Sequence, residues 1–215
     1  MPGIGALGLS GARSFCAFNP SLDRSETAAE SPSFQEKKGD KKADAEQLAR
    51  ALDYFSSEKF HECLILLQPL NRRYKLNPRY RAYLAVCLYY EWEYDEAVKL
   101  FDEVIPQLQG VAPHELSLYY WMDAESYFAL QQYGCALPLY EKMLPLCRDN
   151  EKPDAYYRMG FCHLFAAESS GSSAEERKKA KECFELSLQG YLKYRNTPNE
   201  KARIAQIRHM IGGLK

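Results

Sequence analysis

The side chains best suited to acid–base, metal or nucleophilic chemistry are scattered along this chain and do not form a group. The seven cysteines form no Cys-x-x-Cys pair and no Cys/His spacing that suits zinc, which indicates buried or free thiols in a reducing compartment. The four histidines fall in different parts of the sequence. These residues are Cys16, Cys63, Cys87, Cys135, Cys147, Cys162, Cys183, His61, His114, His163 and His209.

Acidic side chains gather between Glu91 and Glu96, where the sequence predicts a turn between two helices. A solvated turn explains these carboxylates better than a metal site does. The chain has no serine nucleophile elbow, no phosphate-binding glycine loop between a strand and a helix, and no HExxH motif. We therefore expect no enzyme activity, no cofactor and no metal.

Composition favours a packed domain. The chain is 46% hydrophobic and 27% charged, which excludes global disorder, and its net charge of −1 argues against nucleic-acid or membrane-surface partners. The longest apolar runs, such as Cys63–Leu67, are far shorter than the roughly 20 residues that span a bilayer. No basic residue precedes the short apolar stretch at the start, so we expect a cytoplasmic protein without a signal peptide.

Residues 1–42 differ from the rest of the chain. They are rich in glycine, proline and serine, and they show no helical period of apolar residues. We expect a flexible, low-complexity tail here, in which the lysines before residue 43 form a solvated linker. Whether translation starts later, so that the tail has no role, stays open.

From Ala43 onward, apolar residues recur at spacings of three and four, and helix-starting signals separate the runs. Asn77-Pro78 predicts an N-cap followed by proline in the first turn, and Pro113 and Pro153 fit the same position. Alternation with period two is rare, so the chain is predicted to be all-α.

A spacing repeats along the helical part: an aromatic residue, a small residue three positions later, and a large apolar residue four positions after that. The four instances are Phe60, Cys63 and Leu67; Tyr94, Ala97 and Phe101; Tyr133, Ala136 and Tyr140; and Arg177, Ala180 and Phe184, where the aromatic residue is lost. A second small residue precedes each instance, at Ala51, Ala85, Ala124 and Gly160. Small residues at a crossing let two helices approach to roughly 8–10 Å, so the pattern predicts stacked helical hairpins.

This pattern resembles the tetratricopeptide repeat, most clearly in Leu84-Ala85 with Tyr94-x-x-Ala97-x-x-x-Phe101. Arg50 and Asp123 depart from it, because the family has leucine at these positions. The resemblance implies a right-handed α-α superhelix of about four hairpins with a C-terminal capping helix. The expected units are residues 43–77, 78–112, 113–152 and 153–196, followed by the capping helix in 197–215.

In that family the first helix of each hairpin lines the concave surface and binds peptides. The resemblance places Leu52, Phe55, Val86, Tyr89, Tyr90, Trp121, Glu125, Phe128, Tyr157, Phe161 and Leu164 on this surface. No lysine or arginine stands at these positions, so we expect no clamp for a peptide carboxylate.

The expected function is non-catalytic binding of a protein or peptide with an apolar or amphipathic segment. Two alternatives remain from the sequence. One is a bacterial secretion-type chaperone for a hydrophobic client. The other is a structural homo-oligomer in which a second copy fills the groove by self-association.

Overall fold

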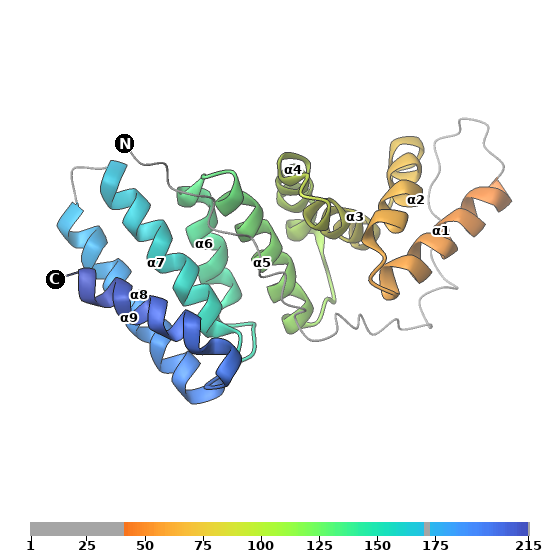
Figure 1. The fold of residues 1–215 in the computed structure, drawn as a ribbon. Coiled ribbons are helices and arrows are strands. Elements are labelled where there is room, and N and C mark those ends of the chain that lie inside the picture. The colour runs from red at the N-terminus through yellow and green to blue at the C-terminus, as the bar shows by residue number, and fades with distance from the viewer. Residues whose placement is uncertain (1–40, 170–172, 215) are drawn as a thin grey trace. The chain divides into compact units, whose positions relative to one another are not determined.

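A computed structural model describes residues 41–169 and 173–214, and its regular structure within these ranges is entirely helical (Figure 1). This confirms the predicted all-α fold class. The helices are α1 (Lys41–Ser56), α2 (Phe60–Arg73), α3 (Pro78–Tyr90), α4 (Tyr94–Val104), α5 (Pro113–Ala129), α6 (Tyr133–Met143), α7 (Lys152–Ser169), α8 (Ser173–Tyr194) and α9 (Lys201–Gly213), with short 3-10 helices η2 (Ile105–Gln107) and η3 (Pro198–Glu200). No described helix is long and apolar enough to cross a membrane.

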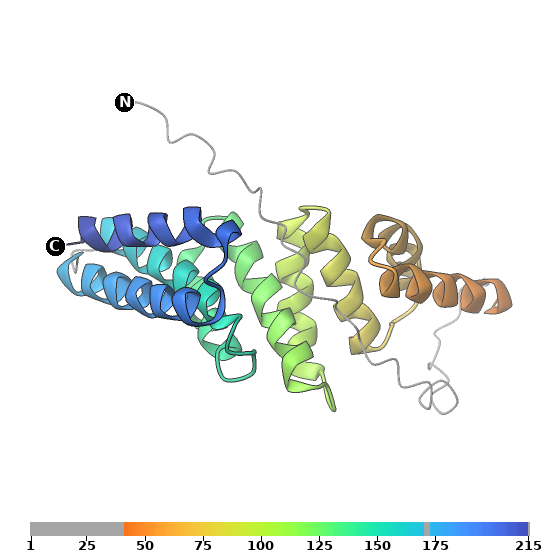
Figure 2. The same ribbon diagram turned by 60° about the horizontal axis from the view of Figure 1, so that its bottom comes forward.

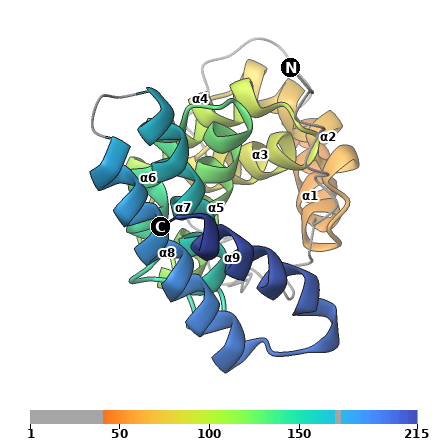
Figure 3. The same ribbon diagram turned by 60° about the vertical axis from the view of Figure 1, so that its left-hand side comes forward.

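The helices pack as consecutive hairpins. The pairs α1–α2, α3–α4, α5–α6 and α7–α8 pack within hairpins, and α2, α4 and α6 each also pack on the first helix of the next hairpin. Helix α9 runs beside α8 (Figures 2 and 3). The predicted tail lies almost wholly outside the described residues, except that Lys41 and Lys42 already belong to α1.

Local signals explain where two of the first helices begin. The side chain of Asn77 accepts a hydrogen bond of 2.9 Å from the backbone N–H of Tyr80, and Pro78 is the first residue of α3. Pro113 is likewise the first residue of α5, although its N-cap residue, Ala112, makes no side-chain capping hydrogen bond. Proline is favoured there because the first N–H groups of a helix have no intrahelical partner.

The small residues lie where the repeat predicts them. Ala51, Ala85, Ala124 and Ala136 are fully buried, as are the large residues Leu67, Phe101, Tyr140 and Phe184 that follow in the second helices. Gly160 shows why size matters at such a crossing. A Cβ atom at Gly160 would lie 2.7 Å from the ring of Phe184, so any side chain there meets a buried aromatic ring.

The first three hairpin turns share one backbone geometry. Glu58, Trp92 and Gln131 have φ values of 57°, 63° and 60°, and each stands two residues before the next helix. In each turn the following N–H donates to a carbonyl five residues earlier, as Glu93 does to Leu88 at 3.0 Å. The turn therefore requires a left-handed residue, which glycine adopts most easily.

The fourth hairpin is longer than the others. Helix α7 runs to Ser169, and α8 starts at Ser173. Most of the extra length therefore extends these two helices, with 18 and 22 residues.

Helix α9 covers the last hairpin. Ile204 and Ile207 join a core cluster with Tyr157 of α7 and with Phe184 and Tyr191 of α8. The capping helix expected from the sequence thus supplies apolar side chains to the end of the stack.

Candidate functional site

The predicted peptide-binding residues differ widely in exposure. Phe55, Val86, Trp121 and Tyr157 are buried, with Trp121 8% exposed and Val86 1% exposed. The half-buried members are Leu52, Tyr89, Glu125, Phe128, Phe161 and Leu164. Tyr90 is exposed at 36%. The four buried side chains stabilise the stack and have little area left for a partner.

Two of the half-buried residues, Glu125 and Phe128, contact Arg158 at an ion pair between two first helices. A guanidinium N–H of Arg158 on α7 donates to Glu125 Oε2 on α5 at 2.7 Å. The same guanidinium lies over the ring of Phe128, 4.7 Å from its centroid. The Tyr140 hydroxyl donates to the other oxygen of Glu125. Both oxygens of this carboxylate are therefore engaged, and an aromatic ring supports its cation.

The charges of this ion pair also affect the pKa values of two nearby tyrosines, Tyr89 and Tyr94. Burial raises the pKa of Tyr89 well above its ordinary value, Glu125 adds to the rise, and Arg158 opposes it. Burial likewise raises the pKa of Tyr94, with the same two charges acting in opposite directions. Burial alone would lower the pKa of Arg158, but Glu125 and Tyr140 raise it overall. We call Tyr89, Tyr94, Glu125, Phe128 and Arg158 the central cluster.

Two members of the central cluster, Tyr94 and Arg158, are not among the residues predicted for the binding surface. Tyr157 was predicted to lie on this surface, whereas it enters the core and the neighbouring Arg158 contacts Glu125. The predicted positions hold no lysine or arginine, but Arg158, next to Tyr157, brings a cation to Glu125. The charge of Arg158 is matched by Glu125, so the cluster carries no excess positive charge for a peptide carboxylate.

Helix α9 limits the predicted surface on its C-terminal side. The guanidinium of Arg203 on α9 lies 4.3 Å from the centroid of the Tyr157 ring, and Tyr157 is 5% exposed. Phe161 and Leu164 pack against the same core cluster. Tyr157, Phe161 and Leu164 therefore belong to the surface on which the capping helix α9 packs.

Stacked aromatic rings join neighbouring hairpins. Tyr90 stacks on Phe60 with ring centroids 4.0 Å apart, and Phe55 stacks on Tyr83 at 4.2 Å. A matching inter-hairpin stack joins Tyr133 and the ring of Phe165 at 4.3 Å. Aromatic residues at the hairpin turns thus hold neighbouring hairpins together.

Three of the histidines contact glutamates, and Cys162 and Cys183 are buried. His61, His114 and His163 each contact one glutamate, at 2.7, 2.9 and 2.7 Å, in different hairpins. Burial raises the pKa of the Cys162 thiol to about 12 and that of Cys183 to about 11, and thiols that stay protonated are poor nucleophiles. The described residues hold no group of three or more His, Cys, Asp or Glu side chains placed to bind a metal ion.

Solved structures with similar folds exist despite low sequence identity. MamA from Desulfovibrio magneticus RS-1 shares 18% identity over 83% of this chain and 95% of its own, with a TM-score of 0.50. MamA AMB-1 shares 12% identity over 81% of this chain and 93% of its own, also with a TM-score of 0.50. No family model matches the sequence, and no curated protein matches it either. The stacked hairpins and this likeness give the chain a tetratricopeptide-like fold.

Proposed function

We propose that this chain is a non-catalytic protein-interaction module that binds an apolar or amphipathic peptide segment at the central cluster. Leu52 and Tyr90 extend this surface toward the N-terminal hairpins. The observation that carries the proposal is the meeting of half-buried aromatic side chains from α3, α4 and α5 around the paired Glu125 and Arg158.

The chemistry of the central cluster favours recognition by shape and apolar contact. Tyrosine and phenylalanine rings offer large contact area at low conformational cost, and tyrosine hydroxyls add hydrogen bonds. The Glu125–Arg158 pair is locally neutral, so it orients a peptide by hydrogen bonding without selecting for a charged terminus. An amphipathic helix that inserts apolar side chains along such a surface fits these properties.

The test is a selection experiment on the full-length chain. A displayed library of random 16-residue peptides is panned against the protein, and the affinities of enriched peptides are measured for three proteins: the wild type, Phe128→Ala and Ile65→Ala. Ile65 is a matched control because it is an apolar side chain on α2 with 56% exposure.

We expect enriched peptides with apolar residues at helical spacing, and a loss of roughly tenfold in affinity for Phe128→Ala alone. Enrichment of peptides defined by a free C-terminal carboxylate would contradict the proposal. So would equal affinity of all three proteins. Sedimentation of the wild type at micromolar concentration separates peptide binding from a surface already filled by a second copy.

A further inference from the structure

Trp92 combines a strained backbone conformation with a large apolar side chain that is exposed to solvent. It lies in the α3–α4 turn with φ of 63°, although left-handed backbone geometry is an outlier for a bulky residue. It is also 76% exposed, the highest exposure among the large apolar residues that the structure describes. The equivalent positions of the two other turns hold the polar residues Glu58 and Gln131.

An aromatic neighbour enlarges this exposed surface. Tyr90 precedes Trp92 by two residues, is 36% exposed, and stacks on Phe60 at the start of α2. Within the described part of the chain, Trp92 itself makes no ring stack and no cation–π contact. Its aromatic face is therefore available to a cation from outside the chain.

The turns around Trp92 are strongly acidic. Glu91 and Glu93 flank it in sequence, and Asp95 and Glu96 follow in the first turn of α4. Of these four carboxylates, Glu91 contacts His61 at 2.7 Å and Glu96 contacts Lys99 at 3.0 Å.

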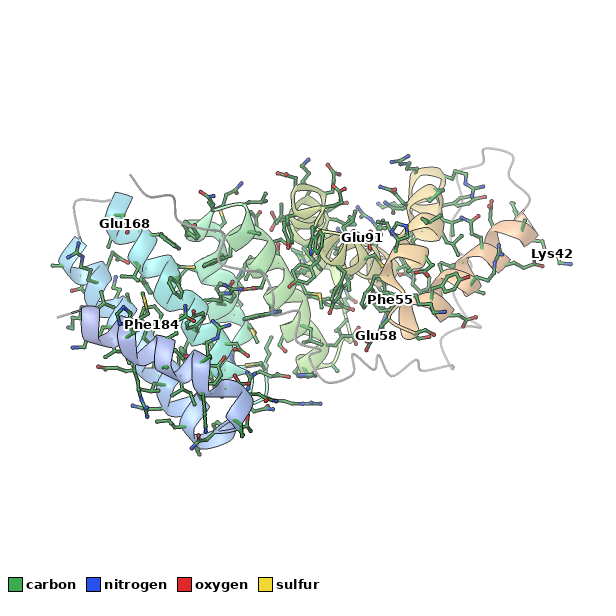
Figure 4. The ribbon with its side chains drawn as sticks, in the orientation of Figure 1. Lys42, Phe55, Glu58, Glu91, Glu168 and Phe184 are labelled. Carbon is green, nitrogen blue, oxygen red and sulfur yellow. The ribbon has the colours of Figure 1, made fainter. Side chains whose placement is uncertain are left out.

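The neighbouring hairpin adds to this negative charge. The charge of Glu58 contributes to the raised pKa of Tyr90, behind burial as the larger cause, so this acid also lies near the aromatic pair. Glu58 and Glu91 are labelled in Figure 4. The cation Lys59 lies 5.8 Å from the centroid of the Tyr54 ring. Acids thus outnumber the cations of these two turns.

We propose that Trp92, Tyr90, Glu91, Glu93 and Asp95, the Trp92 platform, form a second docking surface, for an arginine- or lysine-rich segment of a partner protein. A guanidinium or ammonium stacks on the indole, and the surrounding carboxylates attract the remaining positive charge. The platform lies at the α3–α4 turn and adjoins the central cluster, since the rings of Tyr89 and Tyr90 have centroids 5.2 Å apart. Charge complementarity selects a basic segment over the apolar segment proposed for the first-helix surface.

One substitution at Trp92 removes the aromatic face and is expected to stabilise the folded chain at the same time. Trp92→Gly deletes the indole at a position where glycine relieves backbone strain, so this variant is expected to melt at a higher temperature than the wild type. Gln131→Gly is the matched control, because it makes the same backbone change in the α5–α6 turn. If Trp92→Gly fails to fold, Trp92→Asn tests the same point, since asparagine also tolerates left-handed geometry.

The probe is a fluorescein-labelled octapeptide of alternating arginine and glycine, titrated with the full-length chain at low salt and followed by fluorescence polarisation. A leucine–glycine octapeptide is the uncharged comparison. We expect the arginine peptide to bind the wild type and Gln131→Gly alike, and to bind Trp92→Gly about tenfold more weakly. Glu93→Gln combined with Asp95→Asn should weaken binding and flatten its dependence on salt.

Three results would overturn the proposal. The first is equal affinity of the wild type and Trp92→Gly for the arginine peptide. The second is equally tight binding of the leucine–glycine peptide. The third is self-association of the wild type that Trp92→Gly abolishes, which would identify a second copy as the occupant.

Discussion

Glu125 and Arg158 are 33 residues apart in sequence and form an ion pair of 2.7 Å between α5 and α7. The pair links the third hairpin to the fourth at the point where the aromatic side chains of the central cluster gather. Because most of both side chains is shielded from water, removing either partner leaves a poorly solvated charge behind.

Coupling between these two residues is open to measurement by a double-mutant cycle. Glu125→Gln is expected to lower the free energy of unfolding by about 2 kcal/mol, and Arg158→Met by a similar amount. The double variant should lose less than the sum, because no uncompensated charge remains. Urea unfolding of the four proteins gives the coupling energy, and additive losses would show that the pair does not interact.

Close packing at Gly160 predicts a large effect from one methyl group. Gly160→Ala is expected to destabilise the chain by about 1–3 kcal/mol, because the added Cβ meets the fully buried Phe184 ring. Gly134→Ala in α6 is the control, since nothing lies within 4 Å of its added Cβ. That variant should be neutral or more stable by about 0.5 kcal/mol. Thermal unfolding of both variants decides, and equal melting temperatures would rule out a tight helix crossing at Gly160.

Asp123 predicts a pH dependence of stability. This residue is 1% exposed, and neither carboxylate oxygen has a hydrogen-bond partner in the described structure. Burial raises its pKa from 3.8 to about 8, with the charge of Asp102 adding to the rise and Lys142 opposing it. At neutral pH the Asp123 carboxyl group is therefore largely protonated in the folded state, and it loses this proton when the chain unfolds.

Because the folded pKa is the higher one, the stability linked to Asp123 is fully present below about pH 4 and is lost as pH rises through about 8. Asp123→Leu, which restores the residue type expected from the repeat, should raise the melting temperature more at pH 8 than at pH 5. Asp95→Asn, at an exposed position of α4, serves as the control. A gain for Asp123→Leu that is the same at both pH values would show that this carboxylate does not titrate in the range.

Backbone strain in the hairpin turns is testable at two adjacent glutamines. Gln131 has a φ of 60° and Gln132 a φ of −91°, and both side chains are exposed. Gln131→Gly should stabilise the chain by about 1 kcal/mol, whereas Gln132→Gly should destabilise it by about 0.5 kcal/mol. Chemical denaturation separates the two, and a loss of stability in both variants would mean that Gln131 is not strained.

The sequence predicted the features that depend on local spacing. Ala51, Ala85 and Ala124 mark the helix crossings because only short side chains permit close approach, and Asn77 marks a helix start because its side chain caps a free N–H. These features follow from residues a few positions apart, which a single sequence displays directly.

Features that depend on tertiary packing could not be predicted from the spacing of residues in the sequence. Tyr157 and Arg158 are neighbours on α7, and helical periodicity alone does not decide which of them faces Glu125. The contact of Arg203 with Tyr157 depends on how α9 docks, and the left-handed geometry of Trp92 depends on how α3 and α4 join. Sequence spacing fixes none of these three relationships.

The most direct test of the central cluster as a peptide-binding surface is site-specific photo-crosslinking in the full-length chain. A photoreactive phenylalanine analogue is placed at position 128 in one protein and at position 65 in another, and each is irradiated with a peptide enriched by the selection. We predict a covalent adduct with the peptide from position 128 and none from position 65. Equal adduct formation at both positions, or adducts from position 65 alone, would contradict the account.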